Sequence, residues 1–291
     1  MTFNDNSNIS GGKVSHRGRN GGIAVGGGLG AILLYFVLSQ LGVDVSGVTG
    51  DPSQAGGEGT SLENCQTGAD ANANVDCRMK GAAASLENYW AEELPALGGT
   101  YRSPADVALF TGSVSTGCGG ATSATGPFYC PPDETIYIDT AFFDDLRSRF
   151  GSSGGPLAEM YVVAHEWGHH IQGISGTLAS AQDGETGAGS NAVRTELQAD
   201  CFAGSWAAAA SDTEDPSGVP FLEEITPAQI TDALSAAAAV GDDRIQAATQ
   251  GQVNPEGWTH GSSEQRQRWF MIGYEGGAAS CDTFAPSDAE L

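Results

Sequence analysis

The chain has 291 residues, of which 36 are acidic and 12 are basic, so its formal net charge is −24. This balance argues against nucleic acid as a partner, because phosphate binding requires clustered cations. The length is sufficient for a sizeable buried core, which excludes a miniprotein held together by disulfides alone. The acidity itself mainly predicts a soluble, self-repelling surface.

The N-terminal region divides into three segments before the folded domain. Residues 1–22 are rich in Asn, Ser and Gly and lack apolar periodicity, which predicts a disordered cytoplasmic tail. Residues 23–43 carry no charge and are long enough to cross a membrane as a helix. An uncleaved transmembrane anchor is favoured over a cleaved signal peptide, because no small-x-small cleavage pattern follows closely. Residues 44–60 are glycine-rich and predict a flexible linker, so the folded domain spans residues 61–291.

Charged residues around the apolar span predict its orientation. Lys13, Arg17 and Arg19 precede it, so the positive-inside rule leaves the N-terminus in the cytoplasm. The folded domain of a single-pass plasma-membrane protein would then be extracytoplasmic. Glycines spaced four apart within residues 22–30 would permit a homodimer through this face of the span.

All six cysteines follow the apolar span, which agrees with an oxidising compartment. An even number of cysteines predicts disulfides, although the spacing alone does not select among the pairings. The pairing that we prefer is Cys65 with Cys77, Cys118 with Cys130, and Cys201 with Cys281. A zinc cluster held by cysteines is excluded, because the sequence contains no Cys-x-x-Cys pair.

The folded domain is predicted to begin with a helix and a small sheet. Residues 82–94 carry apolar side chains at helical spacing and are followed by Pro95, which predicts a packing helix that ends there. Residues 107–110 and 135–139 read as short strands, separated by a glycine-rich stretch.

Helices are predicted to dominate the C-terminal half of the chain. Each is indicated by an apolar face together with a start or stop signal. They are a helix that begins at Pro156 and is ended by Gly173 and Gly176, one over residues 192–210, one opened by a capping box at Thr226 and ended at Gly241, and one capped by Ser262 or Ser263.

The first of these helices contains the most informative pattern, His-Glu-Trp-Gly-His at residues 165–169. Residues four apart share one helix face, so His165 and His169 can both reach one metal ion. Glu166 lies beside the first histidine, where it can accept a proton from a metal-activated water. His170 lies about 100° around the helix from His169, so it cannot easily share the metal, and either a packing role or a role behind the metal ligands is expected for it.

A catalytic zinc site needs a third protein ligand and a position for water. Glu196 and Asp200 are four residues apart in a run that is otherwise apolar, so they share a helix face. A solvated surface pair is the usual alternative, but carboxylates in an apolar helix need partners. We therefore expect Glu196 to bind the metal and Asp200 to orient a ligand imidazole.

His260 is a second candidate catalytic residue, in a loop just before the last predicted helix. A loop histidine is more often a surface or hydrogen-bonding residue than a catalyst. Peptide hydrolysis, however, creates an oxyanion, which an imidazole donor would stabilise.

Five segments of the chain carry a resemblance to a known family. They are FYCPPDETIYID at 128–139, HEWGHH at 165–170, ELQADCFAG at 196–204, GDDRIQ at 241–246 and THGSSEQR at 259–266. Together they resemble the neutral zinc metallopeptidase family of bacterial membrane proteins, also called YpfJ-like, over roughly residues 61–285 and the preceding anchor. The resemblance implies one catalytic Zn²⁺ held by His165, His169 and Glu196, with Glu166 as base and Asp200 behind the ligands. It implies no particular substrate.

The sequence therefore predicts a membrane-anchored zinc metallopeptidase with an α+β, zincin-like domain, whose cleft lies between the sheet and the motif helices. Its partner would be a peptide or protein substrate, which an edge strand such as residues 135–139 could bind in extended form. Two alternatives remain open. One is a binding or scaffold module whose zinc only joins two helices and therefore has four protein ligands. The other is a zinc hydrolase of a non-peptide amide.

Overall fold

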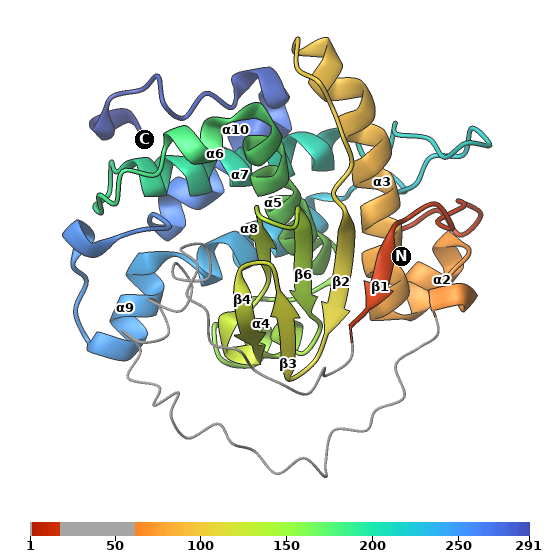
Figure 1. Cartoon of the computed structure of the whole chain (residues 1–291), viewed down its shortest axis with the longest axis horizontal. Coiled ribbons are helices and arrows are strands. Elements are labelled where there is room, and N and C mark those ends of the chain that lie inside the picture. The colour runs from red at the N-terminus through yellow and green to blue at the C-terminus, as the bar shows by residue number, and fades with distance from the viewer. Residues whose placement is uncertain (1, 18–61) are drawn as a thin grey trace.

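The computed structural model describes residues 2–17 and 62–291 (Figure 1). The predicted transmembrane helix at 23–43 and the predicted linker at 44–60 lie outside the described residues. Within the described ranges, none of the helices combines the length and hydropathy that a membrane crossing requires.

The described ranges form an α+β fold, which confirms the predicted class. The strands are β1 (Val14–His16), β2 (Asp106–Phe110), β3 (Ser113–Thr116), β4 (Gly119–Thr122), β5 (Phe128–Cys130) and β6 (Thr135–Asp139). The α-helices are α2 (Gly68–Ala73), α3 (Val75–Ala96), α4 (Phe142–Ser148), α5 (Pro156–Ser175), α6 (Thr177–Ser180), α7 (Asn191–Ala209), α8 (Pro227–Ala239), α9 (Asp242–Gln250) and α10 (Ser263–Gly276).

The main sheet is small and mixed, with the strand order β1-β2-β6-β5. β1, β2 and β6 are parallel, whereas β5 is antiparallel to β6; β3 and β4 form a separate hairpin. The two predicted strands are confirmed as β2 and β6. β6 is wrong as the proposed edge strand, however, because its backbone pairs with β2 on one side and β5 on the other. The described edge strands are β1 and β5.

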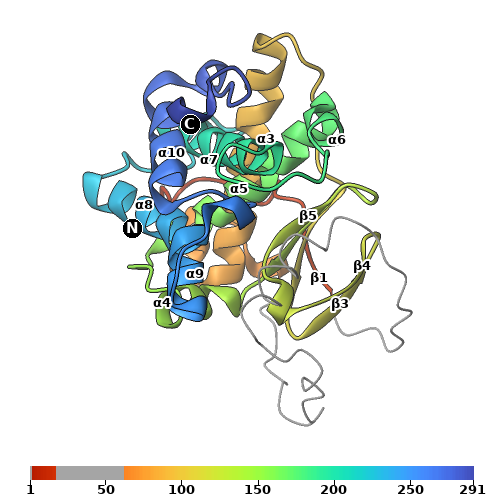
Figure 2. The ribbon, with the colours of Figure 1, turned by 90° about the vertical axis from the view of Figure 1, so that its left-hand side faces the viewer.

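Helix α5 occupies the centre of the fold. It contacts α7 and α8 as well as α3, β5 and β6, and 15 of its 20 residues are buried. Figure 2 shows the strands on one side of α5 and the helices α8 and α10 on the other. Its bounds match the prediction, because Pro156 fits the first turn and Gly176 ends the helix with φ 82°, a conformation that glycine adopts without strain.

The other predicted helices are also present, with one clear difference in length. α7 and α8 lie close to their predicted bounds, and Ser262 rather than Ser263 caps α10. α3 starts at Val75, several residues before the prediction, because the side chain of Asn74 accepts hydrogen bonds from the first free backbone N–H groups. Its final turn also includes Pro95.

All six cysteines form disulfides in the pairing that we prefer, which confirms it. Cys65 is bonded to Cys77, Cys118 to Cys130, and Cys201 to Cys281. The third bond joins α7, which carries the predicted carboxylates, to the C-terminal segment that follows α10. It therefore supports the wall of the fold next to the candidate site.

Residues 2–17, here called the N-terminal arm, contradict the prediction of a disordered tail. Val14 of β1 pairs with Val107 of β2, and the arm residues Phe3 and Ile9 are 1% and 0% exposed. The arm has no apolar periodicity, so its order comes from tertiary contacts that a local pattern does not reveal.

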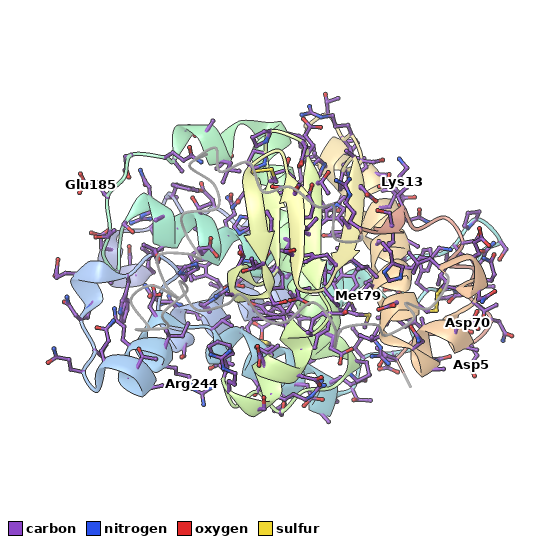
Figure 3. The ribbon with its side chains drawn as sticks, turned by 60° about the horizontal axis from the view of Figure 1, so that its bottom comes forward. Asp5, Lys13, Asp70, Met79, Glu185 and Arg244 are labelled. Atoms are coloured by element: carbon purple, nitrogen blue, oxygen red, sulfur yellow. A yellow bond between two sulfur atoms is a disulfide. The ribbon has the colours of Figure 1, made fainter. Side chains whose placement is uncertain are left out.

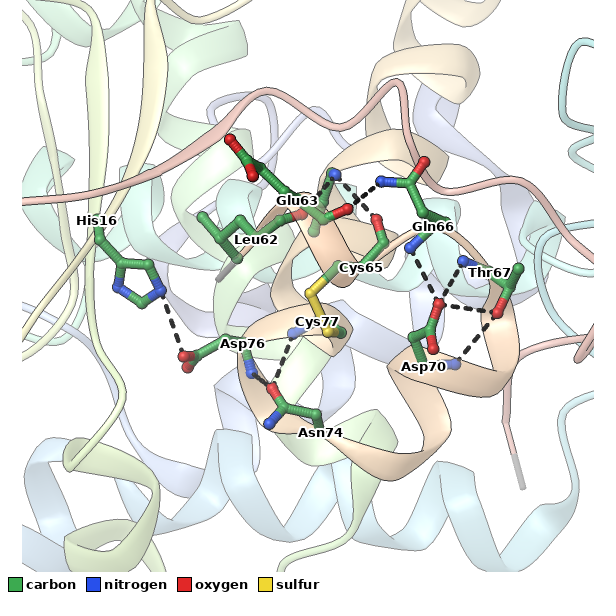
Figure 4. The surroundings of a disulfide bond; sticks show 11 residues. His16, Leu62, Glu63, Cys65, Gln66, Thr67, Asp70, Asn74, Asp76 and Cys77 are labelled. Carbon is green, nitrogen blue, oxygen red and sulfur yellow. Dashed lines mark hydrogen bonds and ion pairs between the residues drawn. A yellow bond between two sulfur atoms is a disulfide. The ribbon is translucent and has the colours of Figure 1, made fainter. Parts of the chain in front are cut away.

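Polar contacts hold the arm at several points along its length. The amide side chain of Asn72 accepts a hydrogen bond from the N–H of Phe3 at 3.0 Å, and Asp215 accepts one from Asn8 at 2.6 Å. At the far end, His16 lies 3.4 Å from Asp76 at the start of α3, beside the disulfide that joins Cys65 to Cys77 (Figure 4). The arm and the domain therefore form one folded body.

Candidate metal centre

The site is built on two helices that approach each other closely. α5 carries His165 and His169, and α7 carries Glu196 and Asp200. Between the two histidines lies Gly168, where an added Cβ would come within 2.9 Å of the Cα of Ala199. Only glycine permits this approach, which brings the side chains of one helix within reach of the other.

Three side chains form a cluster that can hold one metal ion. His165, His169 and Glu196 each offer a ligand atom, and these atoms lie within 4.8 Å of one another. The Nε2 atom of His165 is 3.1 Å from one carboxylate oxygen of Glu196, and the Nε2 atom of His169 is 3.4 Å from the other. The predicted third ligand therefore lies beside both histidines.

The second nitrogen of each imidazole is fixed by a hydrogen bond. His165 donates from Nδ1 to Asp200 at 2.8 Å, and His169 donates from Nδ1 to the amide oxygen of Gln172 at 2.8 Å. Both bonds orient the rings so that the two Nε2 atoms point to the shared centre. Such partners behind histidine ligands set the tautomer and ring orientation in metal sites.

Asp200 is the shared acceptor of a buried hydrogen-bond network behind the metal-ligand cluster. It is 0% exposed and receives two hydrogen bonds from Arg266, at 2.7 and 3.0 Å, and one from the hydroxyl of Tyr161. Burial favours the neutral acid, but Arg266 and His165 outweigh it and lower the pKa of Asp200. The carboxylate is therefore charged and can only accept hydrogen bonds.

The charged groups around the shared centre favour the binding of a cation. Burial opposes protonation of His165, but Asp200 and Glu196 outweigh it and raise its pKa to about 10. Burial likewise tends to raise the pKa of Glu196, yet His169 and His165 hold it well below its usual range. Two imidazole nitrogens with one carboxylate oxygen are a donor set typical of a catalytic zinc site. The residues present therefore fit the predicted metal.

Glu166 lies beside this cluster and is 7% exposed. Burial raises the pKa of its carboxyl group above the ordinary value. The nearby His169 and His165 and a hydrogen bond from the backbone N–H of Tyr129 in β5 oppose this rise but do not cancel it. A carboxyl group whose pKa is shifted toward neutrality can exchange a proton with water more readily than an ordinary glutamate.

His260 faces the same centre from the loop before α10. Its Nδ1 atom is 2.9 Å from the hydroxyl of Thr259 and 3.4 Å from Asp242, which also accepts a hydrogen bond from its backbone N–H. Burial disfavours its charged form, but Asp242 and Glu196 raise its pKa. His170 instead turns away, and its ring nitrogens lie 2.8 Å from the carbonyl oxygen of Arg102 and 3.2 Å from the hydroxyl of Tyr129.

A cleft of about 620 Å³ opens over these residues. Its walls come from β5 and the turn before it, from α5 and α7, from residues 181–186, and from the loop that carries His260. The predicted position between the sheet and the motif helices is therefore correct. β5 borders the cleft with its outer edge, because only its other edge pairs with β6 among the described strands.

Sequence reasoning missed three residues of the network. Tyr161 lies one helical turn before His165, and Gln172 lies three residues after His169, so helical spacing could have identified both. Arg266 ends the THGSSEQR segment, but nothing local indicates that it reaches Asp200 across 66 residues of sequence.

Comparison with known proteins places the chain in a family. The family model described as "Putative neutral zinc metallopeptidase" matches residues 2–284, a range that includes the N-terminal arm. The uncharacterized protein Rv2575 of Mycobacterium tuberculosis is 53% identical over 254 residues, which cover 85% of each chain. The uncharacterized protein YpfJ of Escherichia coli K12 is 38% identical over 271 residues, which cover 90% of this chain and 88% of the relative. No solved structure matches the chain. The chain belongs to the putative neutral zinc metallopeptidase family.

Proposed function

We propose that this protein is a zinc-dependent peptidase with a zincin-like site. One observation carries the proposal: His165, His169 and Glu196 converge on a single point at the wall of a cleft that Glu166 also lines. The metal cluster of the described residues contains three side chains, which favours a catalytic site over a structural one with four protein ligands. Family membership supports the same chemistry.

The chain's own residues account for the proton transfers of amide hydrolysis. Zinc held by the three ligands would supply a Lewis acid that polarises the substrate carbonyl and acidifies water. Glu166 removes a proton from the attacking water as the oxygen–carbon bond forms. Glu166 then passes this proton to the amide nitrogen as the carbon–nitrogen bond breaks. His260 donates a hydrogen bond to the carbonyl oxygen while negative charge develops there.

An extended peptide would bind along β5. The outer edge of β5 borders the cleft, and its Tyr129 backbone N–H already contacts Glu166. Backbone hydrogen bonds from a strand edge hold an extended substrate without reading its sequence. This assignment replaces the earlier choice of β6, whose two edges are paired.

An extracytoplasmic location is part of the proposal. It is supported by the three disulfides, because such bonds persist in oxidising compartments. Attachment to a membrane through residues 23–43 and pairing of two chains there remain proposals that rest on the sequence alone. A single crossing that leaves the N-terminus in the cytoplasm is not part of the proposal, because β1 pairs with β2.

The decisive experiment compares the full chain with Glu166→Gln. Both proteins should bind one zinc ion, and hydrolysis of an unstructured protein such as casein should fall by about 10²- to 10⁴-fold in the variant. Glu224→Gln, an exposed residue outside the cleft, is the matched control and should keep full activity. Equal activity of parent and Glu166→Gln would refute the mechanism. Zinc binding without hydrolysis by either protein would favour the scaffold module.

A further inference from the structure

A second cavity of about 450 Å³ adjoins the cleft. Arg149, Phe150 and Ile245 line both spaces, so the second cavity shares a wall with the candidate active site. Arg244, Ala248 and Thr249 of α9 also line it, together with Ala239 at the end of α8. The lining of the cavity therefore combines two arginines with apolar residues.

Among the polar residues of the GDDRIQ segment at 241–246, Arg244 has a side chain to which no contact with the described residues assigns a structural role. Asp242 accepts hydrogen bonds from the backbone around His260, and Asp243 accepts two from Ser263. Gln246 accepts hydrogen bonds from a backbone N–H and a tryptophan ring in the following loop. The guanidinium of Arg244, by contrast, has no hydrogen bond or ion pair with the residues that the structure describes. Figure 3 shows it on the α9 side of the molecule, away from Asp5 and Lys13 of the arm.

The side chain of Arg149 makes only weak interactions with its neighbours. Its ion pair with Asp145 measures 3.3 Å, and both side chains are about half exposed, so the pair contributes little energy. Its guanidinium lies 5.8 Å from the centroid of the Phe150 ring. Two of the 12 basic residues of the chain thus line one cavity. Because the net charge of −24 makes the surface as a whole repel anions, two neighbouring arginines create a local site that attracts one.

We propose that this cavity is a substrate subsite that binds a carboxylate through Arg244 and Arg149. Guanidinium groups match the planar, two-oxygen geometry of a carboxylate. The apolar lining residues Phe150, Ile245 and Ala248 suit the short aliphatic stem that carries it. Either a glutamate side chain or the free C-terminus of a peptide would supply this group. The subsite rests on the proposed peptidase function and adds a specificity to it.

The test uses synthetic decapeptides that differ only at the carboxylate. One series moves a single Glu or Gln through the positions, and a second series ends in a free carboxylate or an amide. The parent should prefer one carboxylate peptide over its neutral match by about two- to fivefold in kcat/KM, since an ion pair between exposed groups supplies only modest discrimination. In Arg244→Gln the ratio should fall toward one, whereas Arg268→Gln, on an exposed part of α10 outside both cavities, should keep the parent's ratio. The series that responds identifies the source of the carboxylate.

The outcomes separate the subsite from the peptidase function. If the parent hydrolyses neither casein nor any decapeptide, the peptidase proposal fails. Whenever the decapeptides are not cleaved, equilibrium binding of the same peptides to zinc-loaded Glu166→Gln decides the subsite. An equal ratio in the parent and in Arg244→Gln, in cleavage or in binding, overturns the subsite. Loss of the preference at high salt in the parent would support it, because screening weakens exposed charge pairs.

The packing of the N-terminal arm carries a second, independent inference. We infer that residues 2–17 and 62–291 occupy the same compartment. Paired strands lie about 4.8 Å apart, whereas the hydrocarbon core of a membrane is roughly 30 Å thick. A single crossing between residues 17 and 62 would therefore separate β1 from β2 and expose Phe3 and Ile9, which are buried against the domain.

Cysteine labelling of the full chain in intact cells tests this inference. The described cysteines are all in disulfides, so the parent supplies the unlabelled background. Asn6→Cys on an exposed part of the arm and Glu92→Cys on an exposed part of α3 should react equally with a membrane-impermeant maleimide, or both only after lysis. Labelling of Glu92→Cys in intact cells together with protection of Asn6→Cys until lysis would overturn the inference and restore the predicted single-pass topology.

Discussion

The metal centre and the N-terminal arm are both buried, but their order has different origins. At the centre, ligands lie one helical turn apart on α5 and their partners lie one turn apart on α7, so local spacing reveals them. In the arm, Asn8 finds its partner Asp215 across 207 residues, and β1 becomes a strand only by pairing with β2. Periodicity thus identifies residues that act as a local unit and misses segments ordered entirely by distant contacts.

The largest effect should come from Asp200→Asn, which breaks the network behind the ligands. The variant leaves the charge of Arg266 buried without its partner, so the unfolding free energy should fall by about 3–5 kcal/mol. Zinc affinity should fall by about 10- to 100-fold, because His165 loses the carboxylate that orients it. Urea unfolding and equilibrium dialysis measure the two effects. In the double variant with Arg266→Met, stability should largely return while zinc affinity stays low; unchanged zinc affinity in Asp200→Asn would contradict the assigned role.

The matching change in the arm is Phe3→Ala. The ring of Phe3 is 1% exposed and packs over Gly81 of α3, so its removal should lower the unfolding free energy by about 3 kcal/mol. Asn6→Ala, at an exposed position of the same arm, should change it by less than about 0.5 kcal/mol. Identical urea midpoints for the parent and Phe3→Ala would mean that the arm is not part of the cooperative unit.

Proton release on zinc binding tests the protonation state of the metal centre. Because the pKa of His165 is raised to about 10, the metal-free site holds a proton at pH 7 that zinc must displace. Calorimetry in buffers of different ionisation enthalpy should therefore detect release of about one proton or more. In the metal-free protein the raised pKa stabilises the fold fully below about pH 6.5, and this stabilisation is lost as the pH rises toward 10. Binding without proton release at pH 7 would contradict the charge state described for the centre.

The smallest effect concerns the acid sensitivity of the arm. Burial opposes ionisation of Asp215, but hydrogen bonds from Ser217 and from the backbone of Asn8 and Val219 lower its pKa to about 2. A lowered pKa stabilises the fold above the unfolded value of about 4, and this contribution of about 1–2 kcal/mol is lost as the pH falls toward 2. Asp215→Asn should lose that part of the pH dependence in acid-unfolding curves. If the variant and the parent lose stability in parallel between pH 4 and 2, Asp215 does not hold the arm.

Much of the site could be predicted from sequence, for identifiable reasons. His165, His169, Glu196 and Asp200 follow helical spacing, and an apolar helix that carries two carboxylates must provide partners for them. The fold of the arm, the edge position of β5 and the reach of Arg266 could not be predicted. Each depends on which distant segments meet in space, and a short polar strand such as β1 carries no periodic signal of its own.

The central claim is that His165, His169 and Glu196 hold one catalytic zinc ion. X-ray absorption spectroscopy of the zinc-loaded full chain tests it most directly. The predicted spectrum contains two imidazole nitrogens and only oxygen in the remaining positions, all at about 2.0–2.2 Å, and Glu196→Gln should weaken or abolish zinc binding. A third imidazole, from His260 or His170, or a sulfur ligand at about 2.3 Å would contradict the account.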